Sequence, residues 1–381
     1  MDRDELRAWL RLVLTPGVGP TLARRLLAAL GSPQAVWQAS EAALQDWLKP
    51  REIKAVLAPP PAAIDEQLAW CERWLAEPAA PSAPGTERAL ITLADARYPT
   101  SLLQEVADPP VLLWAMGRLN LLQAPALAVV GSRHPTPQGQ DNARAFAQAL
   151  SEAGLTIVSG LADGVDGLAH EGALMGPGST IAVVGTGLDR VYPAKHQALA
   201  HRIAQEGLLI SEFALGTPSI PHNFPKRNRI VAGLTRGTLV VEAALQSGSL
   251  ITARLASEMG REVFAIPGSI HAPQSRGCHA LIKQGAKLVE SSDDVLDELR
   301  WPRLSGPSTA LVEALPGVDE APDAEPDTLL AAMGFDPVSQ DALQARTGLS
   351  TSELGARLLE LELMGRVARL PGLMFQRLGR A

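Results

Sequence analysis

The chain has 381 residues, of which 46% are hydrophobic and 20% charged, and this composition excludes a chain disordered throughout and a collagen-like chain. Its length predicts two or three compact domains rather than one. With 34 basic and 41 acidic residues the formal net charge is −7, which excludes a uniformly basic surface for nucleic acid. It does not exclude a local basic patch.

Nothing in the sequence predicts a membrane segment, a metal site or a disulfide framework. No apolar run approaches the length of a membrane span, and residues 2–5 are charged where a signal peptide needs an apolar stretch. The two cysteines, Cys71 and Cys278, are far apart in the sequence and match no zinc motif. We therefore expect a cytoplasmic protein without metal and without membrane contact.

Residues 1–80 predict a small helical domain. A turn containing glycine and proline at 14–20 is followed by leucines at helical spacing, as in a helix-hairpin-helix or SAM-like domain. The glycine turn of such a motif can offer backbone amides to a phosphate. The charge of residues 1–125 is nearly balanced and gives no electrostatic attraction to DNA, so a role in protein contacts is the alternative.

Residues 90–300 predict an α/β domain. Proline-rich stretches at 78–85 and 305–326 indicate linkers on either side of it, and residues 90–122 form an extended stretch of ambiguous structure. Buried strands are predicted at 127–130, 155–158, 181–184, 208–210, 239–241, 263–266 and 287–289. Helical patterns lie between them at 141–152, 195–206, 250–259 and 279–284. This alternation predicts an extended Rossmann-like fold with a doubly wound parallel sheet, which binds ligands at the carboxyl ends of its strands.

Several of the loops at that edge are rich in glycine and serine. They include Gly131-Ser132-Arg133 after the first strand, Ser159-Gly160 after the second and Ser247-Gly248-Ser249 near the fifth. Backbone N–H groups exposed in such loops at helix starts favour an anion such as phosphate. The first loop lacks the G-x-G-x-x-G pattern of a dinucleotide fold, and no Walker-type phosphate loop is present. We therefore expect no nicotinamide or other cofactor.

The most informative segment is the basic run around Phe224. Residues 213–241 contain no acid, and they carry Lys226, Arg227 and Arg229 at the predicted start of a helix. Cations there oppose the helix macrodipole, and an anionic ligand would relieve that conflict. An aromatic ring among cations suits single-stranded nucleic acid. The alternative is a solvated basic loop with Phe224 in the core.

Four motifs of the central domain resemble the bacterial DNA-processing protein A (DprA/Smf) family. They lie at 129–133, 157–166, 224–234 and 247–253. The resemblance implies a non-catalytic protein that binds and protects incoming single-stranded DNA, forms a homodimer and loads the RecA recombinase onto the strand during natural transformation. The residues before Phe224 depart from members that carry a lysine there. By motif position and the glycine loops, the predicted DNA-binding residues are Gly131, Ser132, Arg133, Ser159, Gly160, Phe224, Lys226, Arg227, Asn228, Arg229, Ser247, Gly248 and Ser249. Arg229 has an alternative interpretation, as an ion-pair partner of Glu212 or Glu242 that shapes the pocket.

The same resemblance places the dimer surface at residues 277–288, with His279, Leu281 and Ile282 as its expected contacts. Leu281 and Ile282 point about 100° apart on a helix, so that one can serve the core while the other faces a partner.

Residues 327–381 predict a winged-helix domain. Helical patterns at 327–333, 339–347 and 351–364 precede two short strands at 366–370 and 373–378. The third helix, which reads duplex DNA in many winged helices, carries Glu353, Glu360 and Glu362 against Arg357 alone. Phosphate would be repelled there, so a protein-contact role is favoured.

Two other functional interpretations remain. A nucleotide phosphoribohydrolase of the lysine-decarboxylase-like Rossmann group is suggested by residues 237–242, but three residues rather than two separate Thr238 from Glu242, and local pairing of Glu242 is the simpler reading. A nucleotide-sensing scaffold would need the glycine loops but not Phe224 beside the basic run. Asp163, Asp166 and His170 suggest acid–base or metal chemistry, yet helix capping by the two aspartates and a structural histidine explain them more simply.

Overall fold

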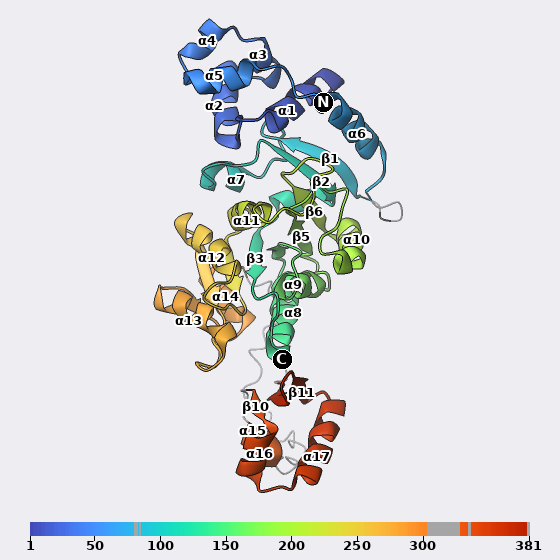
Figure 1. The fold of residues 1–381 in the computed structure, drawn as a ribbon, viewed down its shortest axis with the longest axis vertical. Helices are drawn as coiled ribbons and strands as arrows, with labels where there is room; N and C mark the ends of the chain where they lie inside the picture. Colours follow the sequence, from blue (N-terminus) through green and yellow to red (C-terminus); the bar gives the residue numbers. More distant parts are fainter. Residues whose placement is uncertain (80–82, 84, 303–327, 334–336, 379–381) are drawn as a thin grey trace.

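The structure is a computed structural model that describes residues 1–79, 83, 85–302, 328–333 and 337–378. Residues 1–79 form six helices at one end of the molecule (Figure 1). They are α1 (Arg3–Leu14), α2 (Pro20–Leu30), α3 (Pro33–Gln38), α4 (Glu41–Gln45), α5 (Pro50–Leu57) and α6 (Ile64–Ala76). Gly17, at a φ of +85°, makes the turn between α1 and α2, and Gly19 caps α2 with Pro20 in its first turn.

A nine-stranded sheet forms the centre of the molecule. Its strands are β1 (Glu87–Thr92), β2 (Leu112–Gly117), β3 (Ala126–Val130), β4 (Thr156–Ser159), β5 (Thr180–Val183), β6 (Leu208–Ser211), β7 (Gly237–Val240), β8 (Glu262–Ala265) and β9 (Lys287–Leu288). Their order is β1-β2-β6-β5-β4-β3-β7-β8-β9, in which β2 pairs antiparallel with both β1 and β6. The other pairs in the sheet, which join β6, β5, β4, β3, β7, β8 and β9 in that order, are all parallel. The predicted doubly wound sheet is therefore confirmed. The ambiguous stretch at 90–122 contains β2 and the second half of β1, which begins earlier, at Glu87.

Helices cover both faces of this sheet. They are α7 (Thr100–Glu105), η1 (Leu119–Gln123), α8 (Pro137–Glu152), α9 (Val165–Ala173), η2 (Ala194–His196), α10 (Gln197–Glu206), α11 (Asn223–Gly233), α12 (Ser249–Glu258), η3 (Pro273–Ser275), α13 (Arg276–Lys283) and α14 (Ser292–Glu298). Alternate residues of β3 enter opposite cores: Leu127 and Val129 pack with α8, α9 and α14, whereas Ala128 and Val130 pack with α11, α12 and α13. A strand buried on both faces reads as a continuous apolar run, which is why the parallel strands were predictable.

A third hydrophobic cluster joins the N-terminal helices to the sheet. It contains Leu10 of α1, Trp74 of α6, Trp114 of β2 and Leu209 of β6, all at most 5% exposed. The side chain of Gln67 in α6 also donates a hydrogen bond to the Leu215 carbonyl oxygen, 2.9 Å away. The first six helices are therefore packed against the sheet through one shared core.

The C-terminal domain lies at the other end of the molecule (Figure 1). It contains α15 (Thr328–Met333), β10 (Val338–Ser339), α16 (Gln340–Thr347), α17 (Thr351–Leu363), β11 (Val367–Leu370) and β12 (Met374–Arg377). Its three-stranded sheet has the order β10-β12-β11, and among the described residues its core is built from Leu329 to Phe375. The predicted helices and strands are present, and residue 327 of the first predicted helix lies outside the described residues. The domain boundaries at 80, 90, 300 and 327 stay predictions.

Candidate nucleic-acid interface

A pocket of about 840 Å³ lies at the carboxyl ends of the parallel strands, where the strand order reverses between β3 and β7. We call it the rim pocket. It is lined by Val130, Gly131, Ser132, Arg133, Gly160, Ala162, Asp166, Tyr192, Ser219, Pro221, Phe224, Pro225, Arg227, Asn228, Val231, Ala244, Gln246, Ser247, Gly248, Ser249, Ile251 and Thr252. Ten of the thirteen residues predicted to bind DNA are among them. The other three, Ser159, Lys226 and Arg229, do not line this pocket.

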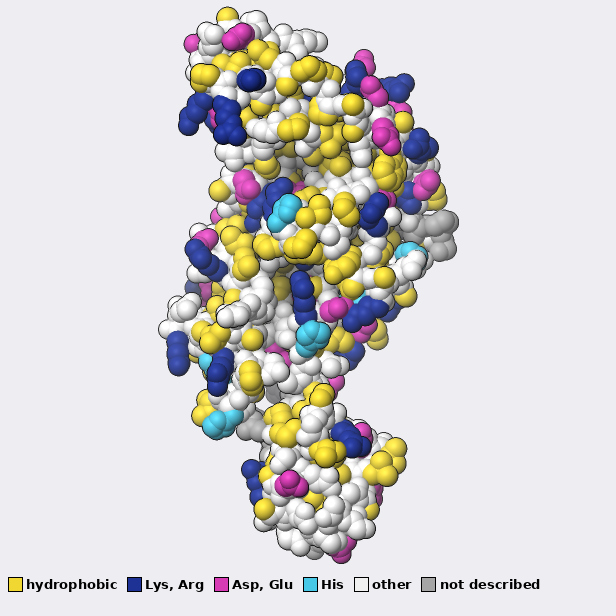
Figure 2. All heavy atoms as spheres, in the orientation of Figure 1, with side chains coloured by type: hydrophobic (Ala, Val, Ile, Leu, Met, Phe, Trp, Pro, Cys, Tyr) yellow, Lys and Arg dark blue, Asp and Glu magenta, His cyan; other side chains and the backbone are white. Residues whose placement is uncertain are grey.

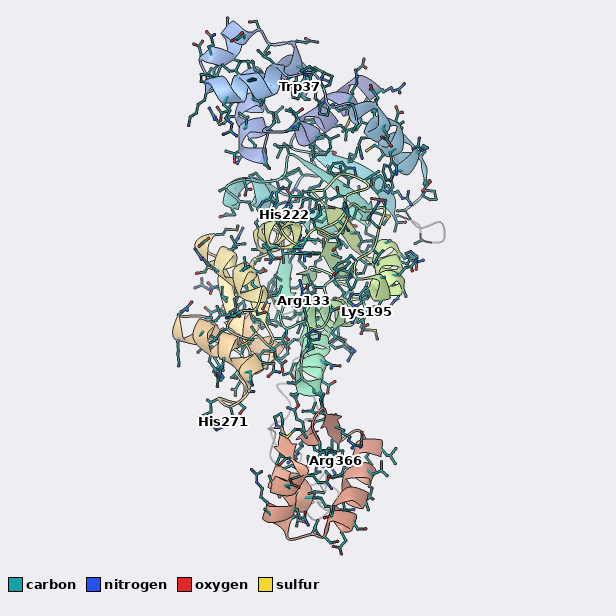
Figure 3. All side chains as sticks on the ribbon, in the orientation of Figure 1. Trp37, Arg133, Lys195, His222, His271 and Arg366 are labelled. Atoms are coloured by element: carbon teal, nitrogen blue, oxygen red, sulfur yellow. The ribbon has the colours of Figure 1, made fainter. Side chains whose placement is uncertain are left out.

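Arg133 and Phe224 come together in the rim pocket from loops that follow different strands. The guanidinium carbon of Arg133, an exposed residue, lies 5.9 Å from the centre of the Phe224 ring. Arg133 lies in the middle of the molecule, between the segments that carry α9 and α12 (Figure 3). Both residues were predicted to bind DNA, and the structure places them in one pocket, with Phe224 only partly buried.

A second aromatic ring beside Phe224 was not predicted. Tyr192, in the loop after β5, is 50% exposed, and its ring centre lies 5.6 Å from that of Phe224 at an interplanar angle of 39°. Nothing local in the sequence marks Tyr192 as a pocket residue, because its position depends on the course of residues 184–193 over the sheet edge. Together the two rings offer an apolar surface beside a free cation.

The first turn of α11 is anchored beneath these rings. The side-chain amide of Asn223 donates to the Gly185 carbonyl oxygen at 3.1 Å. Arg227 is 4% exposed and donates from Nη1 to the carbonyl oxygens of Gly160 and Val183. Burial lowers the pKa of Arg227 to about 10, against the opposing effect of the Asp166 carboxylate, so the guanidinium stays charged at neutral pH. Arg227 therefore adds positive potential to the pocket floor and ties α11 to two strand loops.

Lys226 and Arg229 contact a carboxylate instead of the pocket. Glu212, whose side chain is 4% exposed, lies 2.7 Å from Nη2 of Arg229 and 3.3 Å from Nζ of Lys226. Arg229 also binds Asp108 through Nε at 3.1 Å, and its side chain is 8% exposed. The sequence suggested Glu212 or Glu242 as an ion-pair partner of Arg229, and the structure shows that the partner is Glu212. Lys226 keeps a 40% exposed side chain, so it alone of the pair is accessible.

Two helix N-termini point at the rim pocket. Phe224 and Pro225 in the first turn of α11 and Ser249 at the start of α12 line it, and Gly248 before α12 is exposed with open space where a side chain would stand. The hydroxyl oxygens of Ser247 and Ser249 are 2.7 Å apart. Asn228 donates from its side chain to the Gly248 carbonyl oxygen at 3.4 Å, so it links the two helix starts. The backbone N–H groups of Ser249, Leu250 and Ile251 already donate within the turn, so it is the dipoles of both helices that favour an anion here.

The loop after β4 is held by two titratable residues. Asp166, in the first turn of α9, accepts hydrogen bonds from the backbone N–H groups of Gly160 and Ala162, so it holds the preceding loop rather than capping α9. Burial raises the pKa of Asp166 even though Arg227 opposes that shift. His170 accepts from the Leu161 N–H through Nε2 at 3.3 Å, and its Nδ1 lies 2.7 Å from the Thr180 hydroxyl oxygen.

That hydroxyl of Thr180 donates to the Ile157 carbonyl oxygen, so His170 must carry its proton on Nδ1 and be neutral. Burial lowers the pKa of His170 to about 3. Leu161 has a φ of +57°, an uncommon backbone conformation for a leucine, which this hydrogen bond helps to hold. The structural interpretation of His170 is confirmed.

The carboxylate of Glu242 is hydrogen bonded to the backbone and the side chain of Thr136. Its carboxylate accepts the Thr136 N–H at 2.9 Å and the hydroxyl of the same residue, and Thr136 caps α8. Burial raises the pKa of Glu242. Glu242 is therefore paired, as predicted, but its partner is 106 residues away in the sequence rather than local, and Glu242 does not line the rim pocket.

The predicted dimer residues lie on α13. His279 is hydrogen bonded through Nε2 to the Gly268 carbonyl oxygen at 2.9 Å. Leu281 and Ile282 are both half-buried and pack against the same core, so neither side chain is fully exposed. Leu288 of the neighbouring edge strand β9 is 42% exposed.

In the part of the chain that the structure describes, no group of acidic, histidine and cysteine residues is arranged to hold a metal ion, and no helix is long and apolar enough to span a bilayer. Cys71 and Cys278 are buried and unbridged. Figure 2 shows lysine and arginine side chains in small separate groups rather than as a continuous basic surface.

Comparison with known proteins identifies the family. The model of the DNA recombination-mediator protein A family matches residues 89–300, more than half of the chain. The chain belongs to this family. A second model, the DprA winged-helix domain, matches residues 313–373.

Curated relatives and solved structures agree with this family. Protein Smf of Escherichia coli is 40% identical over 338 residues, covering 86% of this chain and 84% of its own. DNA processing protein DprA of Streptococcus pneumoniae is 50% identical over 210 residues, covering 55% and 74%. A crystal structure of the Streptococcus protein matches with a TM-score of 0.60 and 38% identity, over 77% of this chain and 97% of that one. A structure of Helicobacter pylori DNA processing protein A, described for its single-stranded DNA binding mode, matches with a TM-score of 0.51 and 32% identity, over 55% and 95%.

Proposed function

We propose that this DNA-processing protein of natural transformation binds single-stranded DNA in the rim pocket. The observation that carries the proposal is the meeting of Arg133 and Phe224 at 5.9 Å beside two helix N-termini. The related Helicobacter protein, which binds single-stranded DNA, supports the same ligand.

The chemistry of the rim pocket suits an unpaired strand better than a duplex. A phosphate can accept hydrogen bonds from Arg133 and from a hydroxyl of the Ser247–Ser249 pair, next to the positive end of the α12 dipole. An unpaired base can stack on Phe224 and Tyr192, a contact that a paired base inside a duplex cannot make. The pocket can therefore bind the charged backbone and the face of an unpaired base without requiring a particular nucleotide sequence.

The same proposal describes a binding protein without catalysis and without a cofactor. The carboxylates near the pocket already serve the fold: Glu242 binds Thr136, and Asp166 binds loop amides. Protection of the strand, homodimerisation through His279, Leu281 and Ile282, and loading of RecA complete the proposed function, and they rest on the family.

Fluorescence anisotropy with labelled oligothymidine tests this proposal. Arg133→Ala should weaken binding and lower the slope of log affinity against log salt by about 0.7, the value for one phosphate contact on a single strand. Phe224→Ala should cost about 1–3 kcal/mol of binding free energy and leave the slope nearly unchanged, because stacking releases no counterions. The matched control is Arg202→Ala on α10, an exposed arginine outside the rim pocket. The proposal is wrong if both variants, still folded, bind as tightly as the parent.

The phosphoribohydrolase alternative has its own test. We expect no release of free base from nucleoside monophosphates above background. Release that is lost in Glu242→Gln would favour the hydrolase over the binding protein.

A further inference from the structure

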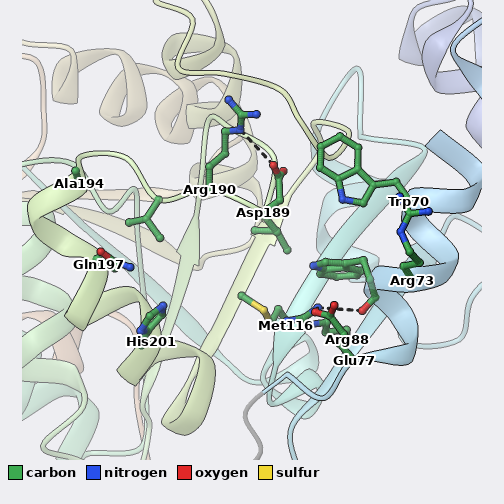
Figure 4. A pocket seen from close by; sticks show the side chains of 13 residues that line it. Trp70, Arg73, Glu77, Arg88, Met116, Asp189, Arg190, Ala194, Gln197 and His201 are labelled. Carbon is green, nitrogen blue, oxygen red and sulfur yellow. Dashed lines mark hydrogen bonds and ion pairs between the residues drawn. The ribbon is translucent and has the colours of Figure 1, made fainter. Parts of the chain in front are cut away.

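A second cavity adjoins the rim pocket on the side of the N-terminal helices. Its volume is about 560 Å³, and we call it the seam groove because it lies where α6 meets the sheet. It is lined by Trp70, Arg73, Trp74, Glu77, Arg88, Met116, Leu188, Asp189, Arg190, Val191, Ala194, Gln197 and His201. Trp70 and Arg73 project from α6, Gln197 and His201 lie on α10, and Asp189 and Arg190 lie between them (Figure 4).

One loop connects the two cavities. Asp189, Arg190 and Val191 line the seam groove, and the next residue, Tyr192, lines the rim pocket beside Phe224. Because consecutive Cα atoms are about 3.8 Å apart, the two linings meet at this point. A strand that stacks on Tyr192 is therefore one residue of this loop away from the lining of the seam groove.

The charges of the seam groove leave cations available. Glu77 pairs with Arg88 at 2.6 Å, and Asp189 pairs with Arg190 at 3.2 Å, so each lining acid already has a cationic partner. Arg73 has no ion pair among the described residues and is exposed. Arg190 keeps a 47% exposed side chain in spite of its pair. The groove is therefore net positive in a chain whose net charge is −7.

Aromatic surface accompanies these cations. Trp70 is partly buried, and its ring packs against Gly216, where an added Cβ would stand 2.9 Å from the indole. This contact fixes the ring in place, and the glycine, at a φ of +84°, allows the close approach. Trp74 forms the groove wall beneath Arg88, whose guanidinium carbon is 5.3 Å from its ring centre. An aromatic ring beside exposed cations is the composition of a surface that binds single strands.

We propose that single-stranded DNA leaving the rim pocket continues past Tyr192 into the seam groove, where Arg73 and Arg190 bind its phosphates and Trp70 offers a stacking surface. This inference rests on the proposed function and extends it, because it gives the N-terminal helices a direct part in holding the strand. The hydrophobic core shared by α6 and the sheet positions the groove before DNA arrives, so no domain movement is needed.

The test compares oligothymidines of increasing length, starting from the shortest that the full-length parent binds. Arg73→Ala and Arg190→Ala should bind that shortest strand like the parent. On longer strands each should lower the salt slope by about 0.7, and the double variant by about 1.4. The matched control is Arg202→Ala, which has the same 47% exposure as Arg190 and also pairs with one acid.

Three outcomes would contradict, in turn, entry of the strand into the seam groove, the role of the groove as an extension of the rim pocket, and DNA binding itself. Parent-like affinity and slope of the double variant at every length would show that the strand does not enter the seam groove. Equal weakening at all lengths would show that these arginines act through the rim pocket rather than as an extension. If the parent binds no oligothymidine at all, the proposed function itself fails.

Discussion

Removal of Arg229 should impair folding rather than DNA affinity, in contrast to removal of Arg133. Arg229→Ala leaves Glu212 buried with only Lys226, at 3.3 Å, to neutralise it. Breaking a buried ion pair from one side costs about 3–5 kcal/mol. Two facts favour the lower end of this range. Lys226 remains as a partner of Glu212. In addition, Nη1 of Arg229 and Oε1 of Glu212 are buried without hydrogen bonds, so the parent ion pair is itself incompletely hydrogen bonded. We therefore expect a loss of about 3 kcal/mol in the free energy of unfolding of the central domain.

Chemical denaturation measures this loss of stability. Salt titration of oligothymidine binding measures whether Arg229→Ala also changes the affinity for DNA. In conditions where Arg229→Ala is folded, its salt slope should equal that of the parent, because the guanidinium does not line the rim pocket. The double variant Arg229→Met with Glu212→Gln should recover much of the stability, since it leaves no buried charge unpaired. A parent-like unfolding midpoint together with a smaller salt slope would refute this reasoning and make Arg229 a phosphate contact.

Three further predictions concern the second ring, the dimer and pH. Tyr192→Ala should cost about 1–3 kcal/mol of oligothymidine binding at an unchanged salt slope, and unaltered affinity would remove Tyr192 from the site. Ile282→Arg should give a folded monomer in analytical ultracentrifugation, and a persistent dimer at micromolar concentration would move the interface elsewhere. The pKa of His170 is about 3 in the fold and 6.5 as a free group, so the fold must exclude a proton that the unfolded chain binds. Its contribution to stability is complete above pH 6.5 and falls by about 1.4 kcal/mol per unit between there and pH 3. His170→Gln should flatten that part of the pH profile of thermal unfolding, and an identical profile would contradict the neutral assignment.

Most strands of the sheet could be predicted from the sequence, whereas only part of the candidate site could. The difference has physical causes. Parallel strands buried on both faces give apolar runs that need no knowledge of their partners. The antiparallel pair β1 and β2 was left ambiguous, because 19 residues separate the end of β1 at Thr92 from the start of β2 at Leu112 and no short turn signals a hairpin.

At the site, loop positions were predictable and side-chain partners were not. Arg133 and Phe224 follow strand ends that the topology brings together, so their meeting could be inferred. Whether a cation in the basic run faces DNA depends on its neighbours in space: Arg229 meets Asp108, which is 121 residues away in the sequence. Tyr192 and the seam groove depend on how one loop crosses the sheet edge, and no local pattern encodes that path.

The hydrophobic cluster that unites the N-terminal helices with the sheet has a consequence for how stability is distributed. Trp74 and Trp114 are buried in one core, so deleting the first 80 residues would expose the inner face of β2 and loosen the sheet. The two parts form one cooperative foldon, whereas the described residues of the winged helix build a core of their own between Leu329 and Phe375 and can open separately. Strand binding at the rim would then protect all six N-terminal helices from proteolysis by mass action, including those that do not touch the strand, and leave the winged helix as cleavable as before.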